Sequence, residues 1–510
     1  MKPTVCLITP PSVFLLDERV FPNLGILKIA AALEARGYPV EHLDLDGVSN
    51  FEQAVEAHFE ASPAEYVGVT CTTPQLPAAV RIARAIRHVR GVAGPQLIVG
   101  GPHPTVTLAA VKKAGAGGRA GRALERLKQE FDVVVAGDGE ESIFSAIGAS
   151  YGSVIDADDA KSPLFLLGKR LEQAPWPARH LLDLDSYRYK IDGVPASTLV
   201  AQLGCPFRCT FCSGRSSPML RRVRFRPTED VLAEVEHLHV RYGFRGFMFY
   251  DDELNVSKGM MDLMRGMAAL AKKHNTEWRL RGFVKAELLT QEQADAMHEA
   301  GFRWLLCGFE SGSERILANI EKQATVADND RAVEYARRAG LKVKALMSLG
   351  HAGESAETIA DTEAWLRRVR PDDFDATVIT PYPGSPYYDE SVPSEFVWND
   401  RSRLETANKL QACWTYTHPK SGDRLHMVEL DYAETVDFYK GAPGEYRAYT
   451  WTDHLSSADL VRMRDELETR VRADLGIPYN AGAPGIQFEA SMGQTKKLPP
   501  SILRSTAGML

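Results

Sequence analysis

Three cysteines lie within eight residues of the sequence, in the stretch AQLGCPFRCTFCSG at residues 201–214. They are Cys205, Cys209 and Cys212, and the whole chain has 7 cysteines. Thiolates at this spacing can hold a metal, but a structural zinc site needs four ligands and normally adds a second Cys or His pair. A cubane iron–sulfur cluster also takes four ligands, so three thiolates leave one iron open to a small chelating molecule. The spacing therefore favours a [4Fe-4S] cluster with an open iron over a zinc site.

The cysteine loop follows a predicted strand, STLVAQL at residues 197–203. Beyond the loop, strand and helix patterns alternate, as in the helix TEDVLAEVEHLHVRYG and the strand FRGFMFYDDE. Six such βα repeats over residues 196–395 predict a parallel barrel or part-barrel. Chemistry in these barrels lies at the carboxyl ends of the strands, which is where the cysteine loop falls.

Residues 1–150 show a second alternation of buried strands and helices, which predicts a doubly wound, Rossmann-like parallel sheet. Ligands of such sheets bind at the carboxyl ends of the strands. Here those ends read TPPS, TCTTPQ, GGPHPT and GDGEES. Glycine and proline are ordinary at any one turn, but the four loops together predict a nucleotide-like cofactor. No GxGxxG dinucleotide fingerprint follows the first strand.

Composition excludes several other classes of protein. A chain of 510 residues predicts two or three domains, and 44% hydrophobic with 25% charged residues is typical of a soluble globular protein. A net charge of −7 with scattered basic residues argues against a nucleic-acid partner. No apolar run approaches the roughly 20 residues of a membrane span, and the start reads as a strand rather than a signal peptide. An odd number of cysteines does not suggest a secreted disulfide framework, so we expect a reducing cytoplasm.

With these features together, the chain resembles the radical S-adenosylmethionine (SAM) superfamily. The motif CxxxCxxC on the loop after the first barrel strand carries the resemblance, and Phe211 before the last cysteine matches its usual form. In that family SAM chelates the open iron and is cleaved to methionine and a 5′-deoxyadenosyl radical, which abstracts a hydrogen atom. The resemblance implies SAM contacts from the strand ends YDDE and GFESGS and from one arginine. The candidates are Asp251, Asp252, Glu253, Arg281, Glu310 and Ser311. A helix N-cap is the alternative role for Asp252.

The doubly wound domain before the barrel resembles the cobalamin-binding domain of cobalamin-dependent radical SAM enzymes, on VGGPHPT and FDVVVAGDGEES. The Asp-x-His-x-x-Gly pattern that supplies a cobalt-ligating histidine elsewhere is absent, so we expect a lower face of cobalt without histidine. His103 is expected to contact the nucleotide tail or, equally, to be a capped turn histidine. The cofactor-binding candidates that the resemblance implies are Thr72, Thr73, Gln75, Gly100, Gly101, His103, Thr105, Gly137, Asp138 and Glu140.

The expected fold class is therefore α/β. A Rossmann-like cobalamin-binding domain (1–150) and a connector (151–195) precede a (β/α)6 radical SAM part-barrel (196–395), followed by a mostly helical C-terminal region (396–510) that caps the substrate. An ordinary packing role for this last region is equally consistent with its sequence. Cys413 in it is a candidate substrate-side thiol or, more simply, a packed cysteine.

The resemblance implies a cobalamin-dependent radical SAM methyltransferase. It would methylate an unactivated carbon of a small molecule or natural-product intermediate, through the 5′-deoxyadenosyl radical and methylcobalamin. The alternative is an oxidative cyclase or rearrangement enzyme with the same cofactors. A methylthiotransferase would need three more cysteines in the first domain, which has only Cys6 and Cys71. A non-enzymatic sensor would not need SAM-binding strand ends. The reaction implies an external electron donor such as flavodoxin or ferredoxin, and no membrane partner.

Overall fold

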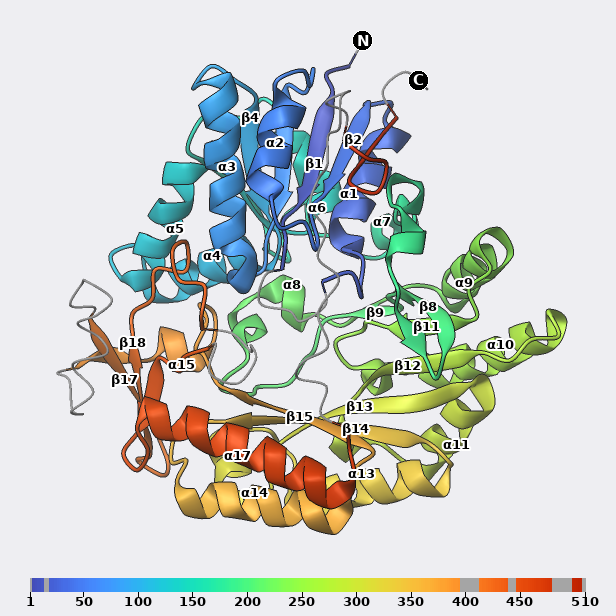
Figure 1. Ribbon diagram of the computed structural model, residues 1–510, viewed down its shortest axis with the longest axis vertical. Helices are drawn as coiled ribbons and strands as arrows, with labels where there is room; N and C mark the ends of the chain where they lie inside the picture. Colours follow the sequence, from blue (N-terminus) through green and yellow to red (C-terminus); the bar gives the residue numbers. More distant parts are fainter. Residues whose placement is uncertain (1, 13–17, 395–411, 439–445, 479–497, 507–510) are drawn as a thin grey trace.

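Two parallel sheets, each with its own helices, form the molecule. The computed structural model describes residues 2–12, 18–394, 412–438, 446–478 and 498–506. In Figure 1 the N-terminal sheet stands above the larger curved sheet, and the short helix α8 (Pro218–Arg221) lies between them. Within the described residues, no helix is both long enough and apolar enough to cross a membrane.

The first sheet has seven strands in the order β20-β2-β1-β3-β4-β5-β6. Strands β1 to β6 are parallel, and β20 pairs antiparallel with β2. The sheet confirms the doubly wound fold, and it recruits two strands from outside residues 1–150. The bounds are β1 Val5–Thr9, β2 Val40–Asp44, β3 Tyr66–Thr70, β4 Gln96–Gly100, β5 Val133–Gly137, β6 Ser153–Ala157 and β20 Leu503–Ser505.

Helices cover both faces of this sheet because its strands are apolar on both sides. In β1 every residue is buried: Val5 and Leu7 pack toward α1 and α6, and Cys6 and Ile8 pack toward α2 and α3. Continuous burial of this kind is typical of parallel strands between two helical layers. The helices are α1 Leu24–Ala35, α2 Phe51–Phe59, α3 Leu76–Arg90, α4 Pro102–Ala114, α5 Arg119–Glu130 and α6 Gly139–Ala146.

The second sheet has the order β15-β14-β13-β12-β11-β8-β7. Its first six strands in this order are parallel, and β7 (Lys190–Ile191) pairs antiparallel with β8. This confirms the six-stranded part-barrel. The parallel strands are β8 Val194–Leu199, β11 Gly246–Phe249, β12 Arg279–Val284, β13 Phe302–Glu310, β14 Lys342–Leu349 and β15 Asp373–Val378.

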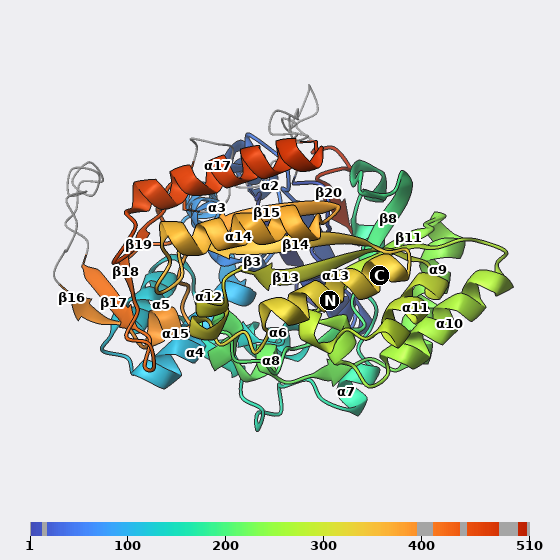
Figure 2. The same cartoon turned by 90° about the horizontal axis from the view of Figure 1, so that it is seen from below.

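The helices of the barrel cover the outer face of its sheet, as Figure 2 shows from below. Several begin where the sequence supplies a cap: the hydroxyls of Thr290, Thr325 and Ser355 each accept a backbone N–H of the first turn. These caps fix where each strand-to-helix loop ends. The helices are α9 Thr228–Tyr242, α10 Met260–Lys273, α11 Gln291–Ala300, α12 Glu314–Asn319, α13 Val326–Arg338 and α14 Ala356–Val369.

Short elements connect the two sheets. Ser217 donates a hydrogen bond of 2.7 Å to Asp158, and Arg224 forms a buried ion pair of 2.7 Å with Asp138. These bonds hold the cysteine-bearing segment against the first domain. The elements are α7 Lys169–Glu172, β9 Gln202–Leu203, β10 Arg224–Phe225 and α15 Pro386–Asp389, with α8.

The C-terminal region differs from the mostly helical one expected. Its described part has one long helix, α17 (Ser457–Leu475), and a four-stranded antiparallel sheet shared with the end of the barrel. Strands of three to five residues leave too short a pattern to predict, while α17 packs on β15 through a bond of 2.8 Å from the Ala376 amide to Glu468. Cys413 is buried in β17. The strands are β16 Val392–Ser394, β17 Cys413–Thr417, β18 Arg424–Val428 and β19 Thr450–Thr452.

Candidate active site

The cysteine loop lies at the carboxyl end of β8, where the sequence placed it. The Cys205 amide donates to the carbonyl oxygen of Leu220 at 2.9 Å, and the Thr210 amide donates to that of Ile320 at 2.9 Å. The loop is thus held from two sides, by α8 and by the segment after α12. As whole residues, Cys212 is exposed and the other two cysteines are half-buried.

The spacing of the three sulfurs does not suit a single metal ion. In the described part of the chain, the only group of three ligand atoms within 4.8 Å of one another is Cys6, Glu41 and His58. A tetrahedral zinc with Zn–S bonds of about 2.3 Å would hold its thiolates about 3.8 Å apart. The loop sulfurs are spread more widely, as ligands to separate irons of one cluster must be. The donor set therefore fits an iron–sulfur cluster.

The compact group in the first domain is accounted for without a metal. His58 Nε2 lies 3.0 Å from Glu41 Oε2 and 3.8 Å from Cys6 Sγ, and Ser62 Oγ donates to the same carboxylate oxygen at 2.9 Å. The residues are buried between β1, β2 and α2. Each polar group has a hydrogen-bond partner, which is what a buried polar cluster requires.

Burial raises the pKa of all three loop thiols, that of Cys205 to about 11 and that of Cys212 to about 12. At Cys209 the ammonium groups of Lys322 and Lys285 act in the opposite direction. The thiols are therefore protonated in the metal-free protein at neutral pH. A bound metal reverses this, because coordination deprotonates a thiol.

Three acidic residues follow β11 beside the loop, and they differ in their partners. Asp251 accepts the Ala201 amide at 2.8 Å, and Asp252 accepts the Gly204 amide at 2.6 Å. Both carboxylates therefore brace the entry to the cysteine loop. Glu253 has a buried oxygen, Oε2, with no partner among the described residues. Burial raises the pKa values of Asp251 and Glu253 to about 7. An unsatisfied buried acceptor beside the loop fits a donor group of a bound molecule.

Glu310 ends β13 with a left-handed backbone, φ +67°, and belongs to a buried polar network. Its Oε1 lies 3.1 Å from Lys322 Nζ, and its Oε2 accepts Ser348 Oγ at 2.8 Å. Ser348 in turn contacts His351 Nε2 at 2.7 Å. Burial opposes the charge on Lys322, but Glu310 holds the pKa of that ammonium above its usual value. The sequence did not predict Lys322; Glu321 and Gln323 on either side of it also have positive φ.

Two candidates from the sequence lie apart from the cysteine loop. The Ser311 hydroxyl is buried and contacts Thr362 Oγ1 of α14 at 3.1 Å, so it faces the outer helices. Arg281, the predicted SAM-contacting arginine, lies within β12, which continues to Val284. Its guanidinium therefore lies halfway along the barrel wall, where Nη1 is 3.4 Å from the Tyr189 hydroxyl.

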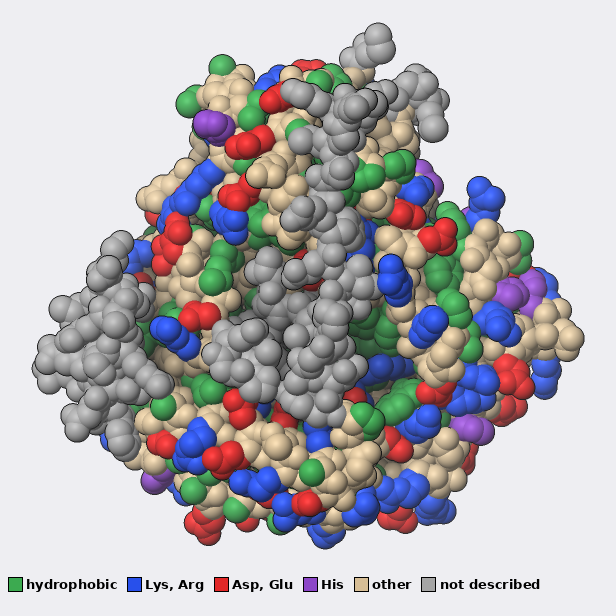
Figure 3. All heavy atoms as spheres, in the orientation of Figure 1, with side chains coloured by type: hydrophobic (Ala, Val, Ile, Leu, Met, Phe, Trp, Pro, Cys, Tyr) green, Lys and Arg blue, Asp and Glu red, His purple; other side chains and the backbone are tan. Residues whose placement is uncertain are grey.

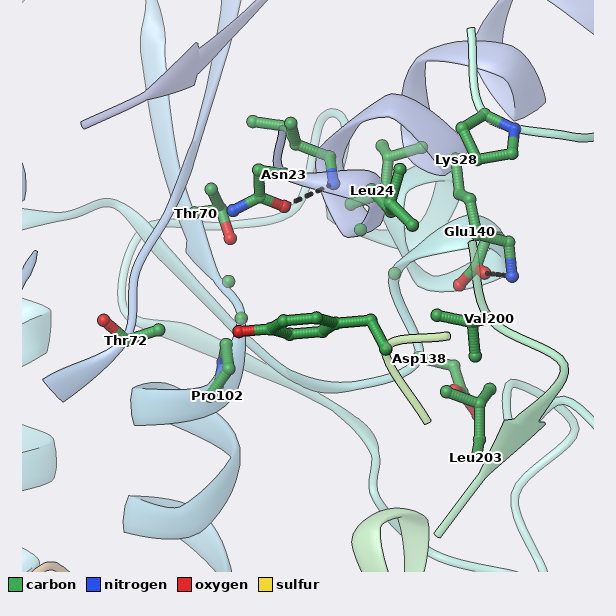
Figure 4. Close-up of a pocket in the computed structure, with 18 of the residues that line it drawn as sticks. Asn23, Leu24, Lys28, Thr70, Thr72, Pro102, Asp138, Glu140, Val200 and Leu203 are labelled. Carbon is green, nitrogen blue, oxygen red and sulfur yellow. Dashed lines mark hydrogen bonds and ion pairs between the residues drawn. The ribbon is translucent and has the colours of Figure 1, made fainter. Parts of the chain in front are cut away.

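A cavity of about 800 Å³ lies between the two sheets, and both domains line it. Figure 4 shows Thr70, Thr72, Pro102, Asp138 and Glu140 from the first domain around it, with Val200 and Leu203 from the barrel side. Most of the first-domain candidates reach its wall, at the carboxyl ends of the strands where a doubly wound sheet binds ligands. They are Thr72, Thr73, Gln75, Gly100, Gly101, Gly137, Asp138 and Glu140.

The barrel side of the cavity carries residues from both ends of the cysteine loop. Gly204 and Ser213 flank the three cysteines and line the cavity, together with Asp252. Tyr250 also lines it and is 50% exposed. No sequence pattern singled out Tyr250, or the ion pair of 2.7 Å between Lys28 and Glu140 on the opposite wall. The cavity therefore extends from the strand ends of the first domain to both ends of the cysteine loop, while the three cysteines themselves are not among its lining residues.

Glycine keeps the floor of this cavity close to the strand ends. At Gly101, φ is +100°, and an added Cβ would lie 2.8 Å from Thr70 Oγ1 and 3.0 Å from the Cys71 amide nitrogen. At Gly137, φ is +95°, and a Cβ would lie 2.3 Å from the Ala157 carbonyl carbon. No histidine is among the described residues on the cavity wall. A cradle of this shape fits a flat cofactor laid over the strand ends.

His103 and Thr105 lie behind the cavity wall rather than on it. His103 is 1% exposed, its Nδ1 contacts Thr73 Oγ1 at 3.0 Å, and burial lowers its pKa to about 4. Two roles were predicted for His103: a contact to the nucleotide tail of cobalamin, and a capped turn histidine. This geometry matches the second. The Thr105 hydroxyl donates to the Gly101 carbonyl at 2.8 Å and accepts the Gly137 amide at 2.9 Å. It thereby ties the two glycine loops together.

Comparison with known proteins gives two matching family descriptions. The B12 binding domain matches residues 17–145, and the Radical SAM superfamily matches residues 199–366. An uncharacterized methyltransferase of Pyrococcus horikoshii is 26% identical over 371 residues, which is 68% of this chain and 74% of that protein. The anaerobic magnesium-protoporphyrin IX monomethyl ester cyclase of Cereibacter sphaeroides is 24% identical over 387 residues, or 72% of this chain and 60% of the cyclase.

Solved structures share the fold. The radical S-adenosylmethionine methyltransferase TsrM of Kitasatospora setae, with cobalamin and a [4Fe-4S] cluster bound, superposes with a TM-score of 0.57 at 18% identity. The superposition covers 76% of this chain and 77% of TsrM. The cobalamin-dependent S-adenosylmethionine radical enzyme OxsB, with aqua-cobalamin, gives a TM-score of 0.57 at 17% identity over 79% of this chain and 56% of OxsB.

Proposed function

We propose, from the premise that this chain is a radical SAM enzyme with an N-terminal B12-binding domain, that it is a C-methyltransferase. Its cofactors are a [4Fe-4S] cluster, SAM and cobalamin. The proposed reaction places a methyl group on an unactivated carbon of a small molecule or natural-product intermediate. The methyltransferase among its relatives supports the reaction type.

One observation carries this proposal: a single cavity is lined by the strand ends of both domains. When bound, the cluster with SAM supplies a hydrogen-abstracting radical, and cobalamin supplies the methyl group. Both must reach one carbon, and holding reacting groups in one enclosed space is worth several kcal/mol of the barrier. Gly204 and Ser213 border the cavity on one side, and Gly101 borders it on the other. The chain thus brings the two sources to one substrate.

On the barrel side, Cys205, Cys209 and Cys212 hold the cluster. Glu253 accepts the ammonium group of SAM, because its buried oxygen is unsatisfied and an ammonium offers only donors. Asp251 and Asp252 position the loop through backbone amides. These assignments give the three acidic residues different tasks.

Farther around the barrel, Glu310 forms an ion pair with Lys322 and accepts the ribose hydroxyls of SAM. Ser311 fixes the end of β13 against α14. Arg281 lies deeper in the barrel, where a substrate group rather than SAM would meet it.

On the other side, Thr72 faces the cobalamin site from the loop after β3. Gln75 holds this loop, because its side chain accepts Thr72 Oγ1 at 3.0 Å and donates to Ser12 Oγ at 2.9 Å. Gly100, Gly101 and Gly137 allow the corrin and its tail to approach the backbone. His103, which contacts Thr73 Oγ1, and Thr105 support these loops from behind. Asp138 and Glu140 border the same space, each held by a cation.

The test is product analysis with SAM carrying a trideuterated methyl group. Anaerobically reconstituted protein is incubated with reductant and candidate substrates, and products are analysed by mass spectrometry. We expect a product that has gained one methyl group with all three deuterium atoms, together with 5′-deoxyadenosine. A modified product without deuterium would contradict methylation.

The second candidate function is oxidative cyclisation or rearrangement with the same cofactors. The likeness to the magnesium-protoporphyrin cyclase supports it. The same experiment separates the two, because cyclisation yields a product that has lost hydrogen and gained no carbon.

A further inference from the structure

Four arginines lie on the cysteine loop and at the end of the short helix α8 that follows it, and the proposed function uses none of them. They are Arg208, Arg215, Arg221 and Arg222. The Arg215 guanidinium donates to the Arg208 carbonyl oxygen, and Arg221 Nη2 donates to the Pro206 carbonyl oxygen at 2.9 Å. The set, called the arginine patch below, is therefore attached to the loop that carries the cysteines. None of its members lines the cavity between the domains.

The charges of this patch are largely uncompensated. Arg215 forms an ion pair of 3.0 Å with Glu321. The other three arginines have no carboxylate within 4.0 Å in the part of the chain that the structure describes, and Arg208 and Arg222 are exposed. On the face of α14 and α17, by contrast, arginines are paired: Arg367 and Arg470 both contact Glu363. Figure 3 shows acidic and basic side chains interspersed on that face.

The arginine patch also lies away from the face of the molecule that α14 and α17 form. In Figure 2, α8 lies in the half of the molecule away from α17, and Arg221 is its last residue. Arg208 directly precedes Cys209 in the chain, so the patch borders the cluster ligands from outside. A protein bound here would lie nearer to the cluster than one bound on the face of α14 and α17.

We propose that the arginine patch docks the electron donor, an acidic one-electron carrier protein of the flavodoxin or ferredoxin class. This inference rests on the proposed function, because it needs the cluster. In the step itself the reduced donor gives up one electron and the oxidised cluster gains it, with no bond made or broken.

Electrostatics favours this one site. The chain has a net charge of −7, so the molecule as a whole repels an acidic partner, while the arginine patch attracts it. Complementary charge of this kind raises association rates more than affinity, and electron-transfer encounters use small interfaces. Four arginines around one loop are enough for such a contact.

The experiment measures reduction of the reconstituted cluster under anaerobic conditions, by its absorbance and electron paramagnetic resonance signal. The double variant Arg208→Glu with Arg222→Glu is compared with the natural protein, using reduced flavodoxin as one reductant and dithionite as the other. We expect reduction by flavodoxin to slow about tenfold or more at low ionic strength, and reduction by dithionite to stay within about twofold, since a small reductant needs no docking surface. Added salt should reduce the difference in flavodoxin-dependent reduction rate between the double variant and the natural protein, because it screens exposed charges.

Lys272→Glu serves as the matched control, since Lys272 is an exposed basic residue of α10, outside the patch. It should leave both rates unchanged. Unchanged reduction of the double variant by flavodoxin would overturn the proposal. If reduction of the double variant by flavodoxin and by dithionite were slowed equally, the proposal would also be overturned, because the arginines would then act on the cluster itself. Failure of the natural protein to form any cluster would instead reject the proposed function.

Discussion

Lys322 Nζ lies 3.1 Å from Glu310 Oε1, and neither side chain is more than 13% exposed. Both residues stand on unusual backbone: Glu310 has φ +67°, and the neighbours of Lys322 have φ +50° and +61°. Positive φ in non-glycine residues costs about 1–3 kcal/mol each and concentrates at functional sites. The fold therefore tolerates strain to hold this ion pair at the carboxyl end of the barrel.

Removing one partner should cost more than an ion pair on the surface is worth. Lys322→Met leaves the Glu310 carboxylate buried without its cation, and we expect a loss of about 3 kcal/mol in stability, seen as a melting temperature several degrees lower. The double variant with Glu310→Gln should recover part of this loss, because no buried charge is left. Arg338→Met is the control, since its pair with Glu334 spans 3.7 Å and is exposed, and it should change stability by less than about 0.5 kcal/mol. Equal losses in the two single variants would contradict the buried pair.

Glu253→Gln tests the proposed ammonium site without changing the shape of the side chain. A hydrogen bond to a charged partner is worth about 1.5–3 kcal/mol, so we expect SAM to bind about ten to a hundred times more weakly at pH 8. Equilibrium dialysis with labelled SAM measures this. The iron content and visible absorbance of the cluster should not change, because Glu253 is not a proposed ligand. Unaltered affinity with an intact cluster would exclude Glu253 from the SAM site.

Gly101→Ala tests the glycine cradle on the other wall. Alanine there must adopt φ near +100° and place its Cβ 2.8 Å from Thr70 Oγ1, so we expect cobalamin binding to be lost while the cluster still forms. The measurement is the corrin absorbance that remains after gel filtration. Gly115→Ala is the matched control: its φ is +86°, but a Cβ there meets nothing within 4 Å. Both variants carry the backbone strain, so full cobalamin retention in Gly101→Ala would argue against the cradle.

The sequence predicted the parts of this protein that rest on local pattern. The cysteine spacing, the apolar strand β1 and the capping residues Thr290 and Ser355 are all encoded within a few neighbouring residues. Both parallel sheets followed from such segments in alternation. The predicted residues that line the cavity are those at strand ends, because chain direction alone brings these ends together.

What the sequence missed depends on contacts between distant segments. Lys322 meets Glu310 only through the turn after α12, and β20 joins the first sheet from residues 503–505. Ser311 directly follows the end of β13, as predicted, but its hydroxyl contacts Thr362 of α14. Arg281 was predicted to contact SAM, and β12 holds it three residues before the strand end at Val284. Side-chain direction and strand length are set by packing, which spacing does not reveal.

Asp251 should make the cofactor-free protein less stable as pH rises. Burial raises the pKa of its carboxyl from 3.8 to about 7, so the folded state holds a proton that the unfolded state has already released between these values. The contribution of Asp251 to the free energy of unfolding is therefore greatest below about pH 4. As pH rises toward 7, this contribution declines by up to about 1.4 kcal/mol per pH unit. Beyond pH 7 the group adds no further slope.

Asp251→Asn isolates that contribution. Asparagine still accepts the Ala201 amide through its oxygen, and it mimics the protonated acid because it carries no charge. We expect the variant to match the natural protein near pH 4 and to exceed it at pH 8 by on the order of 2–4 kcal/mol. Melting temperatures across this range, measured on cluster-free protein, provide the comparison. Glu253 and Glu354, whose pKa values burial also raises to about 7, contribute the same slope to both proteins and cancel. Parallel curves for the two proteins would mean that Asp251 is ionised in the folded state at all pH values tested.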